Sequence, residues 1–305
     1  MIEIEVCGDE KRRIDRVIRK ELSFCSLGEI FRLFRTEKVL INGKKCKESD
    51  RVSSVDEILV LADENELRKQ SAQKIKTANQ NNFRLIYEDE NLLVCDKPFG
   101  LACQPGKGIL TGASLIELAQ NYAKQKFIPY LVHRIDADTS GVILIAKNID
   151  FLRNLQEIWG SKFVKKEYAA LCFGNFAQKS GKIELNLKKT SNEGGGMKMK
   201  AAQNGGLYSV SKYEVVSQNE HCALVFVEIQ TGRTHQIRTH FSHINHHLLG
   251  DKRYGNVQND GKIEKIFGEK ISRLMLHSRK ISFALSKKKY EFESQIPDVF
   301  YKFAK

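Results

Sequence analysis

The chain has 305 residues, about twice the roughly 150 of a typical domain, and its 41% hydrophobic residues are enough for more than one core. Its 9% aromatic residues argue against a disordered chain. Fifty Lys and Arg residues against 37 Asp and Glu give a net charge of +13, which indicates a polyanionic partner, either a nucleic acid or an anionic membrane.

A membrane partner and export are both disfavoured. The longest wholly aliphatic run, residues 142–146, is far shorter than the roughly 20 residues that span a bilayer. The first residues, MIEIEV, carry acids where a signal peptide carries bases, so we expect a cytoplasmic protein. The seven cysteines are scattered without a CxxC pair, which favours reduced thiols over a zinc ribbon or a disulfide framework.

A polar stretch rich in Gln and Asn, residues 63–82, predicts a linker between a small region at 1–62 and a large one at 83–305. In the small region, apolar residues recur at helical spacing from Ile14, with Arg and Lys between them. A second basic helix is expected around residues 30–35. The dipeptide Asn42-Gly43 predicts a tight hairpin, and strands are expected at 2–6 and 58–61.

The large region alternates strand-like runs with a few helical stretches. We expect strands on both sides of a polar turn in 84–97, at 142–146, 167–173 and 223–229, and a terminal hairpin over 281–294. Helices are expected at 114–126, at 150–159 and after Thr234, and glycine loops at 194–196 and 205–206. This is an α+β pattern, and no strand–GxGxxG–helix unit supports a dinucleotide-binding fold.

One polar turn between apolar runs contains Asp136. A carboxylate in such a loop can act as a nucleophile or a general base when a cation keeps it ionised. From the residues alone, a carboxylate that only caps the turn is the simpler interpretation.

A second stretch, residues 228–255, concentrates Arg233, Arg238 and five histidines. Arginine suits pairing with a carboxylate or a phosphate. The histidines could bind a metal, or they could belong to a basic, phosphate-facing helix in which some simply pack. Their spacing matches no HExxH pattern and no acid follows until Asp251, so no metal is expected.

The segment HRIDADTSGVILIAK, residues 133–147, resembles the central motif of the RluA-type pseudouridine synthases. Further stretches agree with that family in the same order, at 87–100, 165–171, 231–240, 250–255 and 276–283. The two basic helices and the VLINGKK hairpin resemble an S4 RNA-binding domain over about residues 12–61. The resemblance implies a catalytic domain with a mixed, mainly antiparallel central sheet, preceded by a small α+β S4-like domain.

The resemblance also implies a reaction that needs no cofactor and no metal. A uridine in RNA is detached at its N1–C1′ bond, turned, and rejoined through C5. Asp136 matches the essential aspartate, Arg238 matches the basic residue that pairs with it, and Tyr168 matches the aromatic residue that stacks on the base. Whether Asp136 adds to the base or the ribose, or removes a ribose proton, stays open.

The same comparison assigns roles around these three residues. Arg134 matches the residue that fills the gap left by the flipped uridine. Arg233 and His235 are expected to contact phosphate, whereas His133 and Thr139 are expected to support the loop.

The chain departs from the family pattern in three places. Ala137 stands where many members carry a second arginine, so one RNA contact is expected to be missing. Ile135 replaces a leucine, which conserves volume. Cys103-Gln104-Pro105 stands where a valine or histidine is common. None of these changes touches the three matched catalytic positions.

The function expected from the resemblance is isomerisation of uridines in 23S ribosomal RNA by a monomer, because an S4-like front module is typical of the members that act on large ribosomal RNA. A transfer-RNA pseudouridine synthase and a non-catalytic S4-type RNA-binding protein are the alternatives. A metal-dependent hydrolase built on the histidines is a further alternative that full activity in EDTA would exclude.

Overall fold

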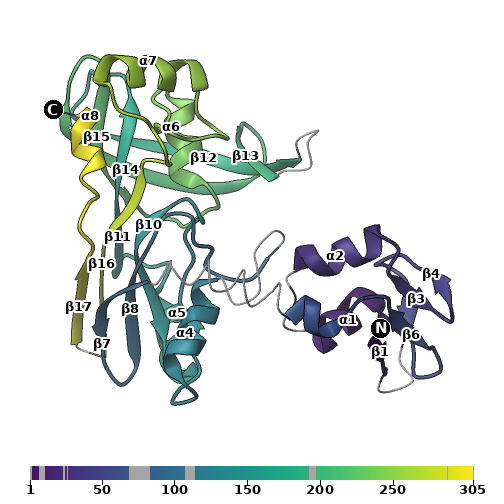
Figure 1. The fold of residues 1–305 in the computed structure, drawn as a ribbon. Helices are drawn as coiled ribbons and strands as arrows, with labels where there is room; N and C mark the ends of the chain where they lie inside the picture. Colours follow the sequence, from purple (N-terminus) through teal and green to yellow (C-terminus); the bar gives the residue numbers. More distant parts are fainter. Residues whose placement is uncertain are drawn as a thin grey trace. The chain divides into compact units, whose positions relative to one another are not determined.

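The computed structural model describes residues 2–6, 11–22, 25, 27–68, 83–106, 114–191, 197–286 and 288–304. The chain divides into two compact units, one formed by residues 1–82 and 101–124 and the other by 83–100 and 125–305. Figure 1 labels the helices and strands of the chain. The prediction from sequence placed 101–124 in the large region, whereas it groups with the first unit. Within this segment the N–H groups of Leu115 and Ile116 donate hydrogen bonds to the carbonyl oxygens of Ala102 and Cys103, so the start of the helix at 115 is joined to residues 102–103.

The predicted linker is described only in part. Residues 64–68 are helical, and 69–82 lie outside the described residues. The elements of the first unit are β1 (Ile2–Ile4), β2 (Arg12–Arg13), α1 (Ile14–Glu21), α2 (Leu27–Arg35), β3 (Val39–Ile41), β4 (Lys44–Lys45), β5 (Arg51–Val52), β6 (Ile58–Val60) and α4 (Leu115–Ala123). Four of its strands form an antiparallel sheet in the order β1-β6-β3-β4, and β2 pairs with β5.

The apolar spacing of the first helix explains its packing. Ile14, Ile18 and Leu22 fall on one face and are almost fully buried in the core of the first unit, which leaves the basic residues between them on the surface. The hairpin prediction is confirmed as well: Asn42 and Gly43 have φ of +48° and +71°, which a tight two-residue turn requires.

The second unit is built on one large sheet. Its strands are β7 (Arg84–Glu88), β8 (Leu92–Lys97), β9 (Tyr130–Leu131), β10 (Ser140–Ala146), β11 (Val164–Phe173), β12 (Ser180–Ser191), β13 (Met197–Ala202), β14 (Leu207–Gln218), β15 (Cys222–Ile229), β16 (Leu276–Leu285) and β17 (Lys288–Glu293). Its helices are α5 (Ile149–Ile158), α6 (Gln236–His243), α7 (Val257–Phe267) and α8 (Val299–Phe303).

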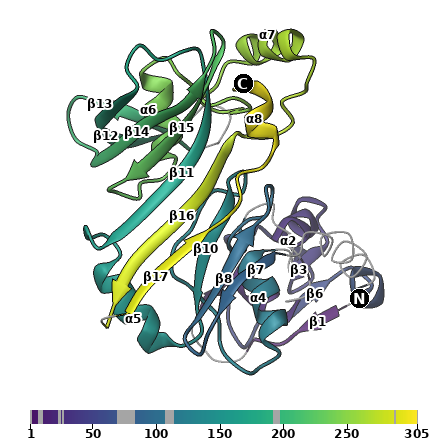
Figure 2. The same ribbon diagram turned by 90° about the vertical axis from the view of Figure 1, so that its left-hand side faces the viewer.

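The strand order confirms the expected mixed, mainly antiparallel sheet. The main path runs β13-β12-β14-β15-β11-β16-β10-β8-β7, with β17 on β16 and β9 on β10. Among the described pairings only β10 with β16 is parallel. Figure 2 shows the long strands β11 and β16 side by side in the middle of the sheet. The glycines at 194–196 lie outside the described residues, and those at 205–206 join β13 to β14.

The parallel pairing of β10 with β16 is short and close. Gly141 lies opposite Ser278 and has a φ of +110°, which side-chain-bearing residues rarely adopt. A Cβ atom at this position would lie 2.1 Å from the Ser278 carbonyl oxygen. Glycine is therefore required where the chain leaves the Asp136 turn and enters the sheet.

The helices of the second unit lie on the sheet, and α6 contacts β12, β13 and β14 (Figure 1). Beneath α6 the largest core cluster of this region includes Ile237 and Phe241 from the helix, and Val225 and Val227 from β15. No helix in the described part of the chain is long and apolar enough to cross a membrane. The six described cysteines are all free thiols.

Candidate active site

The turn that contains Asp136 joins β9 to β10 and is fixed by its backbone. The Thr139 N–H donates to the Asp136 carbonyl oxygen at 3.0 Å and closes the turn. The next carbonyl, of Ala137, accepts from the Gly100 N–H at 2.9 Å and from the fully buried Lys97 Nζ at 3.0 Å. A buried ammonium with its hydrogen bonds satisfied by carbonyl oxygens holds the loop in one conformation.

Asp136 forms an ion pair with an arginine that lies 102 residues further along the chain. Arg238, in the first turn of α6, places Nη1 2.8 Å from Asp136 Oδ2. The same guanidinium is held from its other side by Asp251, with Nε to Oδ2 and Nη2 to Oδ1 both at 2.8 Å. The Asp251 side chain is 1% exposed and that of Asp136 is 28% exposed, so one carboxylate anchors the arginine and the other faces the solvent.

The charges of this group reinforce one another. Burial alone would lower the pKa of Arg238, but hydrogen bonds and charge from Asp251, together with Asp136, raise the pKa above its ordinary value. Burial would also raise the pKa of Asp251, yet Arg238 and the N–H groups of Arg253 and Tyr254 lower it. Both partners of the buried pair are therefore charged at neutral pH, and Arg238 presents a fixed cation to Asp136.

His235 contacts the same oxygen of Asp136 from another direction. Its Nε2 lies 3.6 Å from Asp136 Oδ2, and its Nδ1 lies 2.8 Å from the hydroxyl oxygen of Tyr254. The His235 side chain is 11% exposed, so it faces these two groups more than the surface. Among described residues, none hydrogen-bonds the other carboxylate oxygen, Oδ1 of Asp136.

All six side chains predicted for the site line one cavity, together with apolar residues from β15 and β16. Tyr168, on β11, is 8% exposed and forms part of the cavity wall. Arg134 and Arg233 are exposed at its rim, and Arg233 Nε donates to the Tyr208 carbonyl oxygen at 3.3 Å. The cavity therefore combines a carboxylate, a buried aromatic ring and cations, which suits a planar base attached to a phosphate backbone.

The residues expected to support the loop do so. His133 accepts a hydrogen bond from the Leu144 N–H at 3.2 Å and stacks on Trp159, and burial lowers its pKa to about 3. Thr139 is 2% exposed and lines the cavity behind Asp136.

Three other histidines of the 228–255 stretch pack or hydrogen-bond inside the unit, whereas His243, in the last turn of α6, is exposed. His240 is fully buried, contacts the Ser209 hydroxyl at 2.8 Å, and has a pKa lowered by burial to about 4. His246 and His247 stack on phenylalanine rings. In the described part of the chain no three His, Cys, Asp or Glu residues are grouped as metal ligands are. Packing accounts for His240, His246 and His247.

Two residues of this site were not predicted from the sequence. Asp251 anchors Arg238, and Tyr254 contacts both His235 and, at 5.2 Å from its ring, the Arg238 guanidinium. Both belong to the segment GDKRYG, which already matched the family pattern without an assigned role. An acidic and an aromatic residue shortly after the helix that contains Arg238 are the sequence signal that could have pointed to Asp251 and Tyr254.

Comparison with known proteins identifies relatives that match about nine-tenths of the chain. The sequence profile of the family described as RNA pseudouridylate synthase matches residues 91–243. The chain is 34% identical over 292 residues to "Ribosomal large subunit pseudouridine synthase C" of Vibrio cholerae, covering 93% of this chain and 90% of that protein. It is 31% identical over 284 residues to the protein of the same name from Escherichia coli K12, covering 92% and 88% of the two chains.

A "Ribosomal large subunit pseudouridine synthase D" from Borreliella burgdorferi is 33% identical over 271 residues, covering 85% of this chain and 78% of that one. Among solved structures, "Human RNA Pseudouridylate Synthase Domain Containing 4" is similar with a TM-score of 0.60 at 24% identity, over 77% of this chain and 96% of that one. This last likeness concerns the fold alone.

Proposed function

Because this chain belongs to the RNA pseudouridylate synthase family, we propose that it isomerises uridines of large-subunit ribosomal RNA to pseudouridine, with Asp136 as the reacting carboxylate. The name that the curated relatives share, over about nine-tenths of this chain, supports ribosomal RNA as the substrate class. The cytoplasm is the compartment proposed, because ribosomal RNA is made and assembled there.

The observation that carries the proposal is the way Asp136 is held. Arg238 and His235 both contact its Oδ2, and Arg238 is itself fixed by Asp251. This leaves Oδ1 as the oxygen that can react with the uridine, either by adding to the base or the ribose or by taking a ribose proton. A carboxylate that is fixed before the substrate arrives needs little reorganisation in the transition state.

Two further side chains have roles in handling the base. The buried ring of Tyr168 gives the detached uracil a surface on which to stack and turn, an interaction worth about 1–3 kcal/mol per base. The exposed guanidinium of Arg134 is available to fill the gap that the extruded nucleotide leaves, which offsets part of the few kcal/mol that extrusion costs. Arg233, at the rim, is suited to a phosphate.

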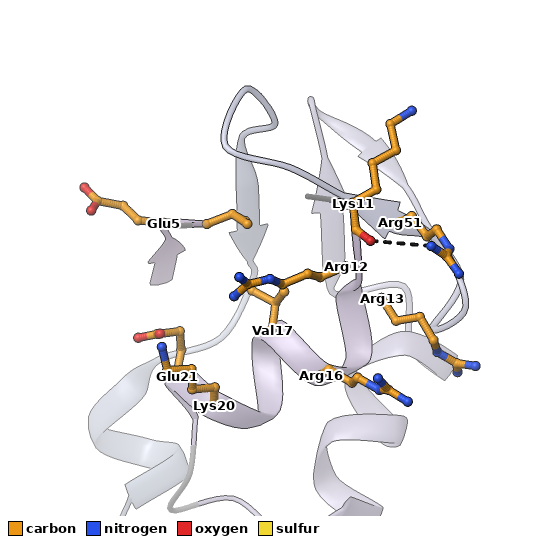
Figure 3. Close-up of a pocket in the computed structure, with 10 residues that line it drawn as sticks. Glu5, Lys11, Arg12, Arg13, Arg16, Val17, Lys20, Glu21 and Arg51 are labelled. Atoms are coloured by element: carbon orange, nitrogen blue, oxygen red, sulfur yellow. Dashed lines mark hydrogen bonds between the residues drawn. The ribbon is translucent and has the colours of Figure 1, made fainter. Parts of the chain in front are cut away.

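The first unit is proposed to be an S4-like RNA-binding module. Its first helix and the neighbouring β5 line a basic cleft, and Figure 3 shows the side chains of Arg12, Arg16 and Lys20 projecting around α1, with Arg51 on a neighbouring strand. Arg12, Arg16 and Lys20 form no ion pair with any described residue. Cations without acidic partners are suited to RNA phosphates.

The proposal is tested by mapping pseudouridines with carbodiimide labelling and primer extension in cells with and without the gene, complemented by wild type, Asp136→Asn or Asp138→Asn. Asp138 is the exposed acid of the same turn and serves as the matched control. We expect particular 23S signals to disappear without the gene, to return with wild type and Asp138→Asn, and to stay absent with Asp136→Asn. In vitro, Asp136→Asn should slow isomerisation at least about a thousandfold while RNA binding persists.

Each other outcome has a definite meaning. If pseudouridine signals disappear from transfer RNA instead, the proposed reaction stands and the proposed substrate is wrong. Turnover by Asp136→Asn would remove Asp136 from its role. No change in any RNA would favour a protein that binds RNA without modifying it.

A further inference from the structure

The hydroxyl of Tyr254 joins an outer strand of the sheet to the site. Its oxygen accepts a hydrogen bond from the Met199 N–H of β13 at 2.8 Å and lies 2.8 Å from His235 Nδ1. Tyr254 is 7% exposed, and the Arg238 guanidinium lies over its ring, 5.2 Å from the ring centroid. Tyr254 does not line the cavity that contains Asp136, so it acts on the site through other residues.

The partners of this hydroxyl determine where its proton goes. Because its oxygen already accepts from Met199, its own hydrogen is best used as a donor to His235 Nδ1. A neutral imidazole carries one proton, so a ring that accepts at Nδ1 carries that proton on Nε2. Nε2 is the atom 3.6 Å from Asp136 Oδ2, where an N–H attracts the carboxylate and a lone pair would repel it.

The surroundings of His235 keep the ring neutral. Burial lowers its pKa, and Arg238 and Arg253 lower it further, which together outweigh the opposing effects of Asp136 and Asp251. The backbone of His235 has a φ of +53°, a left-handed conformation that is uncommon for a residue with this side chain. Backbone strain of this kind is concentrated where a side chain must be aimed at a functional group.

We propose that Tyr254 is a positioning residue for the isomerisation: its hydroxyl fixes the tautomer of His235, so that His235 presents an N–H to Asp136 Oδ2. This inference rests on the proposed function of the site. With Arg238, the imidazole then holds Oδ2 from two directions and keeps Oδ1 directed at the substrate. The hydrogen bond from Met199 also makes this arrangement depend on the position of β13.

The variant Tyr254→Phe isolates the hydroxyl, since it keeps the ring and its packing against Arg238. We expect the single-turnover rate on a 23S fragment to fall about tenfold, the effect of about one neutral hydrogen bond, with little change in the KM for RNA. Tyr301→Phe, at an exposed tyrosine of α8, is the matched control and should leave both constants unchanged. A raised KM with an unchanged rate would overturn the proposal.

A double-mutant cycle separates positioning from a general structural role. His235→Asn is the second variant, because asparagine tolerates the left-handed backbone. If Tyr254 acts through His235, the double variant should be no slower than His235→Asn alone. Losses that multiply would mean that Tyr254 acts only by holding β13, and the proposal would fail.

The tautomer can be read without any RNA. In protein labelled with ¹⁵N-histidine, two-bond ¹H–¹⁵N spectra distinguish Nε2–H from Nδ1–H rings, and the His235 signals are those missing from His235→Asn. We expect Nε2–H in the wild type and a mixture of tautomers in Tyr254→Phe. An Nδ1–H ring in the wild type, or an unchanged ring in Tyr254→Phe, would overturn the inference. This result stands even if the RNA substrate proves to be wrong.

Discussion

Arg238 binds two carboxylates that differ in exposure, and this difference separates their roles. Asp251 is buried and binds the guanidinium through two hydrogen bonds, whereas Asp136 binds through one and keeps an oxygen for another partner. A buried charge without its partner is costly, so Asp251 is what allows Arg238 to be buried at all. The position of Arg238 beside Asp136 therefore depends on Asp251, a residue that does not line the cavity.

Removal of the Asp251 charge should destabilise the fold as well as the site. We expect Asp251→Asn to lower the free energy of unfolding by about 3 kcal/mol at pH 7, because it breaks a buried ion pair. Denaturant melts measure this loss. The control is Glu291→Gln, an exposed partner of Lys280, for which the loss should be under about 1 kcal/mol.

The same pair has a defined pH dependence. Since the folded pKa of Asp251 lies below its ordinary value near 3.8, its contribution to stability is complete above that value and is lost as the pH falls through the folded pKa. The difference in stability between wild type and Asp251→Asn should thus shrink only below about pH 4. A difference that shrinks near neutral pH would show that another group is responsible.

The family resemblance was enough to predict that Arg238 pairs with Asp136, and the two residues do pair although 102 residues separate them. It could not identify how His235, Asp251 and Tyr254 contact them. Those contacts depend on the angle at which α6 lies on the sheet and on the left-handed backbone at its start, and both are set by packing over long distances along the chain.

At the scale of elements, strands and helices with strong apolar patterns were predicted, such as β10, β15 and α5. The strands β12, β13 and β14 were missed, although Ile183, Leu185 and Leu187 alternate with polar residues in β12, which is the pattern of a half-buried strand. Helix α7 was missed because Ile263 is its one buried residue, so its sequence carries almost no apolar period. A helix that buries few apolar side chains shows little apolar periodicity in its sequence.

The pairing of β10 with β16 leads to a test at this scale. Gly141→Ala should destabilise the fold by about 2–4 kcal/mol, the sum of about 1 for the left-handed backbone and about 1–3 for overpacking against Ser278. Gly268→Ala, also at positive φ but with nothing within 4 Å of the added Cβ, should lose only the first part. Equal losses in thermal or denaturant melts would mean that the close approach contributes nothing.

For the molecule as a whole, the division into two units separates proposed chemistry from proposed RNA affinity. The triple variant Arg12→Gln, Arg16→Gln, Lys20→Gln should weaken binding to a 23S fragment and reduce the slope of log K against log salt by about 0.7–0.9 for each phosphate that is no longer neutralised. Filter binding at several salt concentrations measures the slope.

Net charge alone must be controlled in that experiment. Lys262→Gln, Lys265→Gln, Lys270→Gln removes the same charge from exposed positions in and after α7. This second variant should leave the slope nearly unchanged. Equal slopes for the two triple variants would show that total charge, rather than the cleft on α1, determines RNA affinity.

The outer strand β13 also bears on aggregation. A free sheet edge is a template on which a second molecule can add a strand, and natural proteins block such edges with lysines. Lys198 and Lys200 alternate along β13, and Lys188 lies opposite Lys200 on β12, so a second copy would bring like charges together. One N–H of this edge is already occupied by Tyr254. The hydroxyl that is proposed to orient His235 therefore also helps, through its bond from Met199, to keep separate copies of the chain from joining edge to edge.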